Sequence, residues 1–182
     1  MPTKTDNSCL GDKLTIRINH LPDGDLRVLD CFGGEGTIWE RIEKVTGRNI
    51  DCLPIDLKDN GRFRLPGDNL RFLKSLDLSK FNVIDLDAYG VPYKQLKTVF
   101  QSGYAGAVFV TFIQSYVGEL PHEMLIDIGF TQPMINKCRT LLFKHGFDKF
   151  CQWLALQGVT KITHISPTPY KHYIFLDISR SM

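Results

Sequence analysis

The sequence predicts an α/β fold built on a doubly wound, mostly parallel sheet that ends in an antiparallel hairpin. Two observations predict this fold. From residue 26 onward, short apolar runs alternate with segments of helical periodicity, which is typical of parallel strands covered by helices on both faces. The last two apolar runs are separated only by residues 166–169 (Ser-Pro-Thr-Pro), a loop too short for a crossover helix, so we expect them to pair antiparallel.

The expected elements follow in chain order. Residues 13–18 alternate apolar and polar side chains and are expected as a strand within a polar, turn-rich first 25 residues. The other expected strands span residues 26–31, 50–55, 81–86, 106–113, 159–165 and 171–179, with a weak strand or helical turn at 71–76. The expected helices span residues 37–46, 93–101, 133–145 and 149–156, and Gly47 is a natural stop for the first of them.

Length and composition indicate one globular domain. The 182 residues match one domain of about 100–200 residues. Hydrophobic residues make up 43% and charged residues 23%, which argues against disorder and coiled coil. No apolar run approaches the roughly 20 residues of a membrane span, and the N-terminus lacks an apolar signal core. We expect a cytoplasmic protein without a membrane partner, with an extension over residues 1–25 that could contact substrate and one domain over residues 26–182.

Net charge and cysteine content exclude few classes of partner or site. The net charge is +2, from 22 Lys and Arg against 20 Asp and Glu, and it neither demands nor excludes a nucleic-acid partner. The five cysteines form no Cys-x-x-Cys pair and have no ligand-like spacing. They indicate reduced thiols rather than a disulfide framework, and we expect no metal site.

A glycine-rich turn at residues 28–37 (Val-Leu-Asp-Cys-Phe-Gly-Gly-Glu-Gly-Thr) is the densest signal. Glycines between a strand and a helix let the backbone approach a ligand at the helix N-terminus. Asp56, twenty residues after Gly36, ends the next strand, where a carboxylate can accept both hydroxyls of a ribose. The turn is an incidental connection, a dinucleotide fingerprint or the site of another cofactor. Trp39 in place of the third glycine disfavours the fingerprint, and Asp30 would repel a pyrophosphate but attract an ammonium group.

The turn resembles motif I of the S-adenosylmethionine-dependent methyltransferases with a Rossmann-like fold, and its D-x-F-x-G-x-G form is similar to that of nucleic-acid amino-methyltransferases. The resemblance covers roughly residues 26–179 and implies a seven-stranded sheet with S-adenosyl-L-methionine as cofactor. The cofactor-binding residues that it implies are Asp30, Phe32, Gly33, Gly34, Glu35, Gly36, Thr37, Asp56, Leu57, Asp68, Asn69 and Asp87. Asp68 is also typical of a helix N-cap or turn.

Residues 85–92 (Asp-Leu-Asp-Ala-Tyr-Gly-Val-Pro) close the fourth expected strand and are similar to the D-x-D-P-[FY]-G-x-P motif of tRNA guanine-N2 dimethyltransferases. The resemblance implies that Asp87 and the Ala88 carbonyl accept the two N–H groups of an exocyclic amino group, and that Tyr89 stacks the base. Ala88 stands where that family has proline, so the turn is less rigid. Asp87 is alternatively a turn residue or a cofactor contact, and Tyr89 a packed aromatic residue. Asp85 is expected to be a structural acid bonded to neighbouring backbone.

The implied activity is N-methylation of an exocyclic amino group of a base in RNA (tRNA or rRNA) or DNA, with RNA favoured. No Pro-Cys pair supports cytosine-C5 transfer, and no Asp-Asn pair follows the fifth strand for metal-dependent O-methylation. Ribose 2′-O-methylation would need a lysine-rich set of residues with an acid, and the sequence does not identify which lysines would form that set. The same fold acting on a small molecule or protein, or serving as a non-catalytic RNA-binding scaffold, is the alternative, and a protein partner or homodimer is compatible with the compact size.

Basic residues gather in three clusters that either contact phosphates or form solvated surface. The clusters are Arg62, Arg64, Arg71 and Lys74; Lys137, Arg139, Lys144 and Lys149; and Lys161, His164, Lys171 and His172.

Overall fold

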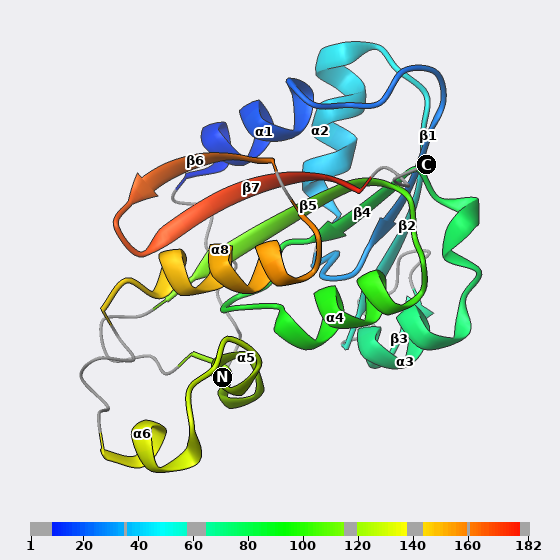
Figure 1. Ribbon diagram of the computed structural model, residues 1–182. Helices are drawn as coiled ribbons and strands as arrows, with labels where there is room; N and C mark the ends of the chain where they lie inside the picture. The colour runs from blue at the N-terminus through cyan, green and yellow to red at the C-terminus, as the bar shows by residue number, and fades with distance from the viewer. Residues whose placement is uncertain are drawn as a thin grey trace.

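The computed structural model describes residues 9–34, 36–57, 65–114, 120–137, 144–159 and 161–178. At its centre is a seven-stranded sheet with the strand order β3-β2-β1-β4-β5-β7-β6 (Figure 1). The strands are β1 (Leu26–Asp30), β2 (Ile50–Asp56), β3 (Leu65–Pro66), β4 (Val83–Leu86), β5 (Gly106–Ile113), β6 (Ile162–Thr168) and β7 (Lys171–Ile178). The helices are α1 (Leu10–Ile18), α2 (Thr37–Thr46), α3 (Asn69–Ser75), α4 (Tyr93–Gln101), α5 (His122–Asp127), α6 (Gln132–Lys137) and α8 (Gly146–Leu156), with a 3₁₀ turn at Leu78–Lys80.

Helices cover both faces of the sheet. α1 and α2 lie on one face, and α3, α4 and α8 lie on the other (Figure 1). Strands β1 to β5 run parallel, whereas β7 pairs antiparallel with both β5 and β6. The predicted doubly wound, mostly parallel sheet with a terminal antiparallel hairpin is therefore confirmed.

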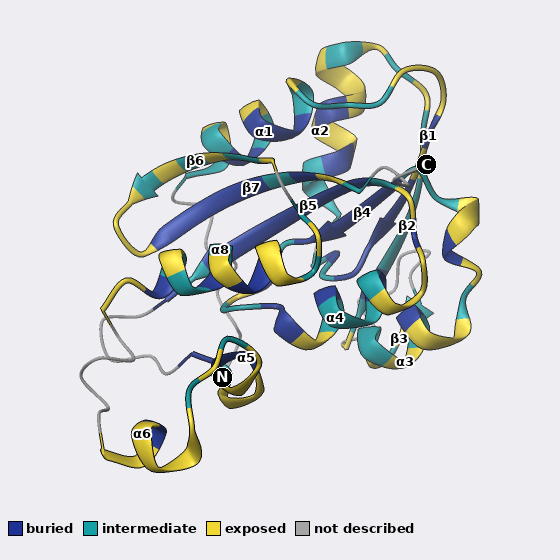
Figure 2. Ribbon diagram, in the orientation of Figure 1, coloured by how far each residue is buried: buried dark blue, intermediate teal, exposed yellow. Residues whose placement is uncertain are grey.

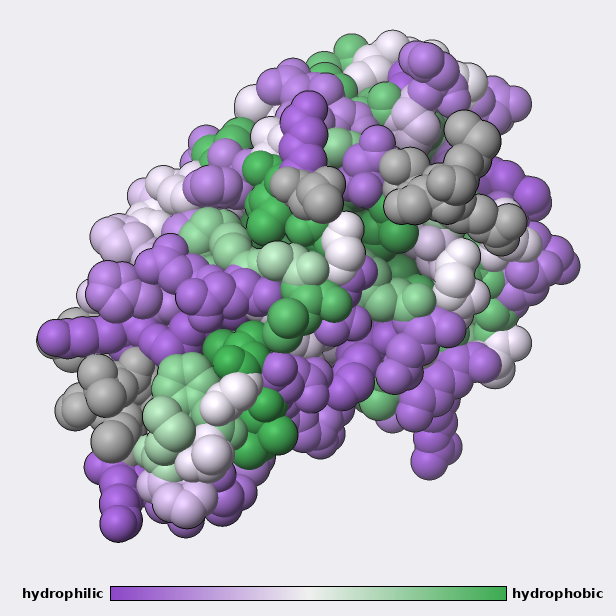
Figure 3. All heavy atoms as spheres, viewed as in Figure 1, coloured by the Kyte–Doolittle hydropathy of each residue, from purple (hydrophilic) through white to green (hydrophobic). Residues whose placement is uncertain are grey.

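Two apolar cores hold the layers together, one on each face of the sheet. Val83 and Ile84 of β4 point to opposite faces because successive side chains of a strand alternate. Val83 packs in the core that contains Trp39 of α2, and Ile84 packs in the core that contains Trp153 of α8. The central strands are almost entirely buried, whereas edge strand β6 has exposed residues (Figure 2). On the face of the molecule that Figure 3 shows, apolar residues gather near the middle and hydrophilic residues surround them.

The strand expected at residues 13–18 is wrong, because this segment lies in helix α1. Leu10, Leu14 and Ile18 stand four residues apart, so the alternating pattern also gives an apolar helical stripe. α1 packs against α2, β6 and β7 and buries Ile16 against the sheet. Six alternating residues fit both periods, and the packing of the helix on the sheet decides between them.

Other segments also differ from their expected bounds. Residues 71–76 were expected as a weak strand or a helical turn, and the helical alternative is correct, because residues 71–75 lie in helix α3 and Leu76 is its C-cap. Residues 166–168, expected in the hairpin loop, continue β6, so the turn consists of Pro169 and Tyr170. β6 is an edge strand with an irregular register between Ile165 and Thr168, which is where a strand tolerates proline. The helix expected at 133–145 begins as α6, and residues 138–143 lie outside the described part of the chain.

Two properties of the described residues bear on the expected surroundings of the protein. None of their helices combines the length and the apolar character needed to cross a membrane. The four described cysteines, Cys9, Cys31, Cys52 and Cys151, form no disulfide with one another.

Candidate active site

The carboxyl ends of β1, β2 and β4 bring the sequence-predicted acids to one edge of the sheet. Asp30, the last residue of β1, lies in register with Pro54 of β2 on one side and with Asp85 of β4 on the other. Asp56 ends β2, and Asp87 follows β4. Ligands of open α/β sheets bind outside this edge, where the strand order reverses. In this sheet that point lies between β1 and β4.

The glycine turn leaves β1 close to β2. The Gly33 N–H donates to the Ile55 carbonyl at 3.0 Å, and a Cβ on Gly33 would lie 2.6 Å from the Cβ of Pro54. Gly34 and Gly36 have φ angles of 46° and 72°, in the left-handed region that favours glycine. Gly36 is the N-cap of α2, which begins at Thr37 without a side-chain cap. Within the described residues no side chain caps the first N–H groups of α2, and free N–H groups at a helix start are typical of anion-binding positions. Glu35 lies outside the described residues.

Asp30 is a buried carboxylate beside this turn, with 6% of its surface exposed. It accepts a hydrogen bond from the Phe32 N–H at 3.2 Å. Burial, and then the neighbouring charge of Asp85, raise the pKa of Asp30 well above its ordinary value. A cation placed at the turn would offset both effects and stabilise the charged carboxylate.

The loop before α3 lies against the glycine turn. The Asn69 side chain donates from Nδ2 to the Cys31 carbonyl at 2.8 Å and accepts from Gln95 at 3.0 Å. The Asp68 side chain accepts from the Leu70 N–H at 2.9 Å, so it is the N-cap of α3 and has the capping role that the sequence left open. Asp56 is half-buried, and its carbonyl accepts from the Gly67 N–H at 2.8 Å.

Leu57 and Tyr89 project from this edge of the sheet with 78% and 82% of their surfaces exposed. The packed-aromatic alternative for Tyr89 therefore does not describe its position. Ala88, before it, is buried, and the carbonyl of Gly90 accepts from the Ile113 N–H at 2.9 Å. The loop after β4 is thus tied to β5 while the Tyr89 ring faces solvent.

Asp85 is bonded to side chains, so the expectation that it bonds neighbouring backbone is wrong. Its two oxygens accept from Arg17 Nε at 2.8 Å and Nη2 at 2.7 Å, and Trp39 Nε1 donates to it at 2.9 Å. Burial raises the pKa of Asp85 above its ordinary value, although the Arg17 cation opposes this shift. Bidentate hydrogen bonds between a guanidinium and a carboxylate are among the strongest in proteins and fix the orientation of both groups.

Asp87 has a donor on each carboxylate oxygen. Lys13 Nζ donates to Oδ2 at 2.7 Å, and the Thr111 hydroxyl donates to Oδ1 at 2.6 Å. Arg17 Nη2 lies 3.8 Å from Oδ2. Burial alone would raise the pKa of Asp87, but Arg17 and then Lys13 outweigh it and lower the pKa below its ordinary value. Asp87 is therefore a charged hydrogen-bond acceptor at neutral pH.

The sequence did not point to four residues that shape this site: Lys13, Arg17, Trp39 and Thr111. Lys13 and Arg17 stand four residues apart, so a helical interpretation of this segment would have placed both cations on one face. Trp39 and Thr111 lie on α2 and β5, and their partners in β4 and the loop after it are set by tertiary packing. No local pattern identifies them.

The basic clusters, which either contact phosphates or form solvated surface according to the sequence, are only partly surface features. Lys171 and His172 are buried, with 6% of each exposed. The His172 ring stacks on Phe147 with centroids 3.7 Å apart. These two residues therefore belong to the packing of the hairpin on α8 and the sheet.

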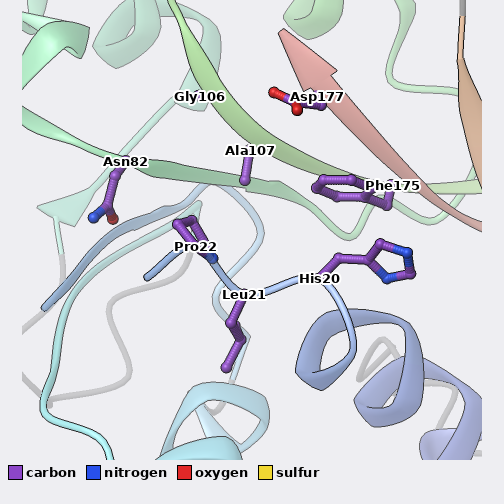
Figure 4. Close-up of a pocket in the computed structure, with 8 residues that line it drawn as sticks. All are labelled: His20, Leu21, Pro22, Asn82, Gly106, Ala107, Phe175 and Asp177. Atoms are coloured by element: carbon purple, nitrogen blue, oxygen red, sulfur yellow. The ribbon is translucent and has the colours of Figure 1, made fainter. Parts of the chain in front are cut away.

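No group of three or more His, Cys, Asp or Glu residues in the described ranges is arranged to hold a metal ion. A separate hollow of about 330 Å³ lies at the opposite edge of the sheet, at the amino ends of β4 and β5 (Figure 4). His20 and Phe175 line it with ring centroids 4.5 Å apart, beside Asn82, Ala107 and Asp177. None of the sequence-predicted site residues lines this hollow.

No protein-family model and no curated protein matches this sequence. Solved structures match in fold. A candidate S-adenosylmethionine-dependent methyltransferase from Methanococcus maripaludis aligns over 97% of this chain and 90% of its own, with a TM-score of 0.54 and 10% identity. Human N-acetylserotonin methyltransferase, solved with S-adenosylmethionine, aligns over 96% of this chain and 52% of its own, with a TM-score of 0.53 and 13% identity.

Other solved methyltransferases are similar to the same extent. Podospora anserina PaMTH1, solved with S-adenosylhomocysteine, aligns over 97% of this chain and 80% of its own, with a TM-score of 0.50 and 15% identity. The chain spans 56% of the length of a candidate O-methyltransferase from Nostoc punctiforme. At such low identity these likenesses show the fold alone. The chain has the Rossmann-like fold of the class I S-adenosylmethionine-dependent methyltransferases.

Proposed function

We propose that the protein is an S-adenosylmethionine-dependent methyltransferase. The observation that carries this proposal is the charge balance at the carboxyl edge of the sheet. Among the described residues that meet there, the carboxylates of Asp30, Asp85 and Asp87 face only the cations of Lys13 and Arg17. Asp30 is the carboxylate without a direct ion pair, and it lies beside the glycine turn. A ligand whose ammonium and sulfonium groups are positive fits this position.

Different residues of the chain would bind different parts of the cofactor. Asp30 would bind the ammonium group, the N–H groups at the start of α2 would bind the carboxylate of the methionine end, and Asp56 would accept the ribose hydroxyls. The exposed side chain of Leu57 lies next to Asp56 and would cover one face of the adenine. When bound, S-adenosylmethionine supplies an electrophilic methyl group on its sulfonium sulfur.

We further propose that the acceptor is the exocyclic amino group of a base, with RNA favoured over DNA. The Tyr89 ring is exposed at the active edge and offers a stacking platform for an unpaired base. Asp87 would accept an N–H of the amino group, and the Ala88 carbonyl the other. Because the pKa of Asp87 is below its ordinary value, this carboxylate orients the amino group and the proton leaves to solvent. Catalysis then rests mainly on positioning.

A hydroxyl acceptor is the second candidate, and the Lys13–Asp87 pair favours it. A hydroxyl both donates and accepts, so it can donate to Asp87 and accept from Lys13 at the same time. An amino group whose lone pair attacks the methyl group cannot also accept from Lys13. O-methylation of a small molecule by the same residues is therefore the alternative activity.

Transfer of labelled methyl from S-adenosylmethionine tests both activities. The panel contains tRNA, rRNA, DNA, protein and small phenols, incubated with wild type, Asp87→Asn and Asp30→Asn. Label recovered on a base amino group after digestion, and lost in both variants, supports the main proposal. Label recovered on an oxygen identifies the second candidate. Salt-dependent RNA binding without any transfer or S-adenosylhomocysteine binding contradicts both and indicates a scaffold.

A further inference from the structure

We propose that Lys13 of helix α1 is a positioning residue for methyl transfer, which acts by holding the Asp87 carboxylate charged and aimed at the acceptor. The inference rests on the proposed function. It makes the first described helix part of the acceptor site. The helix brings Lys13 to a carboxylate 74 residues further along the chain.

The contact between Lys13 and Asp87 differs from a surface ion pair. Their side chains are 8% and 9% exposed, and Nζ lies 2.7 Å from Oδ2. The surface pair Arg27–Asp51 has side chains 59% and 74% exposed and a separation of 3.7 Å. Exposed pairs are screened by water, whereas a buried cation strongly favours the charged form of its partner. Lys13 therefore controls the charge of Asp87 in a way that a surface lysine does not.

The neighbours of Lys13 act on Asp87 in other ways, although the charge of Arg17 lowers the pKa of Asp87 the most. Arg17 is 3.8 Å from Asp87, but its Nε and Nη2 already bond Asp85. Thr111 donates to the other oxygen, Oδ1, so it fixes the plane of the carboxylate without supplying charge. Removal of the Lys13 ammonium group would leave Oδ2 without its closest donor.

Lys13 is also held from the side of β7. Its Nζ lies 5.8 Å from the centre of the Tyr173 ring, a distance at which a cation is attracted to the ring face. Tyr173 is fully buried, and Lys171 Nζ lies over the same ring, 5.5 Å from its centre. Tyr173 is in register with Thr111 on the neighbouring strand. The ammonium group is thus confined between α1, the loop after β4 and β7.

The pH dependence of Asp87 is set by groups from each element around it. These groups are Lys13 and Arg17 on α1, Asp85 on β4, Asp30 on β1 and Tyr173 on β7, beside which Lys171 lies. Lys13 and Arg17 favour the charged carboxylate, while Asp85 and Asp30 disfavour it. Loss of Lys13 alone therefore shifts the balance toward protonation of Asp87.

The test compares wild type with Lys13→Met and Lys13→Arg. ¹³C-carboxyl NMR follows the titration of Asp87, assigned by the signal missing in Asp87→Asn. We expect Lys13→Met to raise the pKa of Asp87 by about 1–3 units, because an opposite charge within about 4–6 Å lowers a carboxyl pKa by that amount. The acid limb of the kcat profile moves to higher pH by the same interval. At pH 7 kcat falls about tenfold or more, because the carboxylate is no longer held in position for the acceptor. Lys13→Arg restores the wild-type titration.

Two readouts separate this role from a structural one. The affinity for S-adenosylhomocysteine, measured by calorimetry, should stay within about twofold because Lys13 pairs with Asp87, which we place at the acceptor. The control variant Lys97→Met removes a lysine that pairs with Asp127 at 3.1 Å, on the other face of the sheet, and should change neither profile. If Lys13→Met does not fold, Lys13→Gln, which keeps a donor without the charge, is measured in its place.

The outcomes distinguish failure of the inference about Lys13 from failure of the proposed function. A wild-type Asp87 titration and acid limb in folded Lys13→Met overturns the inference and leaves the proposed function standing. Absence of methyl transfer by wild type, with S-adenosylhomocysteine bound, overturns the proposed activity and with it the catalytic part of the inference. The Asp87 titration still shows in that case whether Lys13 sets the charge of the carboxylate.

Discussion

Arg17 of α1 and Asp85 of β4 form a buried, bidentate ion pair, with donor–acceptor distances of 2.8 and 2.7 Å and both side chains 1% exposed. Burial alone would lower the pKa of Arg17, but the Asp85 carboxylate raises it above its ordinary value. Trp39 of α2 donates to the same carboxylate. One acid of the central sheet therefore anchors two helices.

Replacement of Arg17 by methionine should destabilise the fold strongly, because it leaves Asp85 buried without its cation. We expect Arg17→Met to lower the free energy of unfolding in urea by about 3–5 kcal/mol. The control Arg27→Met breaks the exposed pair with Asp51 and should cost less than about 1 kcal/mol. Equal losses in the two variants would show that burial does not determine the strength of the Arg17 pair.

Asp30→Asn should stabilise the protein without ligand and weaken cofactor binding. The pKa of Asp30 is raised by burial and by Asp85. A carboxyl group with a raised folded pKa contributes its full stability below its unfolded pKa of about 4, and this contribution is lost as the pH rises through the folded value. The Tm advantage of the variant should therefore grow above about pH 4. Parallel Tm curves with unchanged S-adenosylhomocysteine affinity would contradict this prediction.

Gly33→Ala should disturb the glycine turn. The added Cβ would meet the Cβ of Pro54 at 2.6 Å and its Cα at 3.3 Å, so β2 or the turn has to move. We expect a loss of about 1–3 kcal/mol in unfolding free energy, together with weaker S-adenosylhomocysteine binding. Gly11→Ala, in helix α1 with open space around it, is the matched control and should stabilise by about 0.5–1 kcal/mol. Denaturant unfolding and calorimetry measure both effects.

Asp127 joins three helices through one oxygen, and its loss should loosen them. Oδ2 accepts from the Tyr93 hydroxyl at 2.7 Å, Lys97 Nζ at 3.1 Å and Trp153 Nε1 at 3.2 Å. We expect Asp127→Asn to cost about 1–3 kcal/mol at pH 7. Asp148→Asn, at an exposed pair with His145, should have little effect in the same denaturation experiment.

The effect of Asp127 should depend on pH with a definite sign. Burial would raise its pKa, but the hydrogen bonds from Tyr93, Lys97 and Trp153 lower it below the ordinary value. Its stabilising contribution is therefore present above the unfolded pKa of about 4 and is lost as the pH falls through the lower folded value. The Tm difference between wild type and Asp127→Asn should shrink in acid. A difference that is constant from pH 7 to pH 3 would contradict a charge-based role.

Tyr89→Ala should impair acceptor binding and leave the fold intact, because 82% of Tyr89 is exposed. Base stacking on an aromatic ring contributes about 1–3 kcal/mol, so the Kd for an RNA substrate should rise by roughly five- to 150-fold. Tyr89→Phe keeps the ring and should retain most of the affinity. Fluorescence anisotropy of labelled RNA measures this effect. A wild-type Kd in Tyr89→Ala would remove the stacking platform from the proposed function.

Local sequence patterns were sufficient for most of the fold. The helix over 37–46 and its stop at Gly47, the helix over 93–101 and the strand over 106–113 have the predicted bounds, because periodicity and capping residues agree there. The segment at 13–18 was wrong because a short alternation fits a strand and a helix equally. Its buried cations gain their partners only from β4 and the loop after it, and no local pattern carries that information.

The position of the candidate site in the fold could be predicted from the sequence, but the electrostatic environment of its acids could not. Motif spacing placed Asp30, Asp56 and Asp87 at one edge because parallel strands end together. Asp68 caps α3, as its turn-like neighbours also indicated. The opposite pKa shifts of Asp30 and Asp87 depend on which cations reach each acid across the fold, so they could not be derived from sequence.

The position of β7 has a consequence for synthesis on the ribosome. β7 is the last strand in chain order, yet it lies between β5 and β6 and pairs with β5 over eight residues. Until residues 171–178 emerge, the apolar β5 presents an unpaired edge and β6 has no partner in the sheet. Such an edge invites pairing with other nascent chains. Completion of the sheet, and with it protection from aggregation, therefore waits for a strand that a ribosome makes long after the half of the domain that contains the glycine turn.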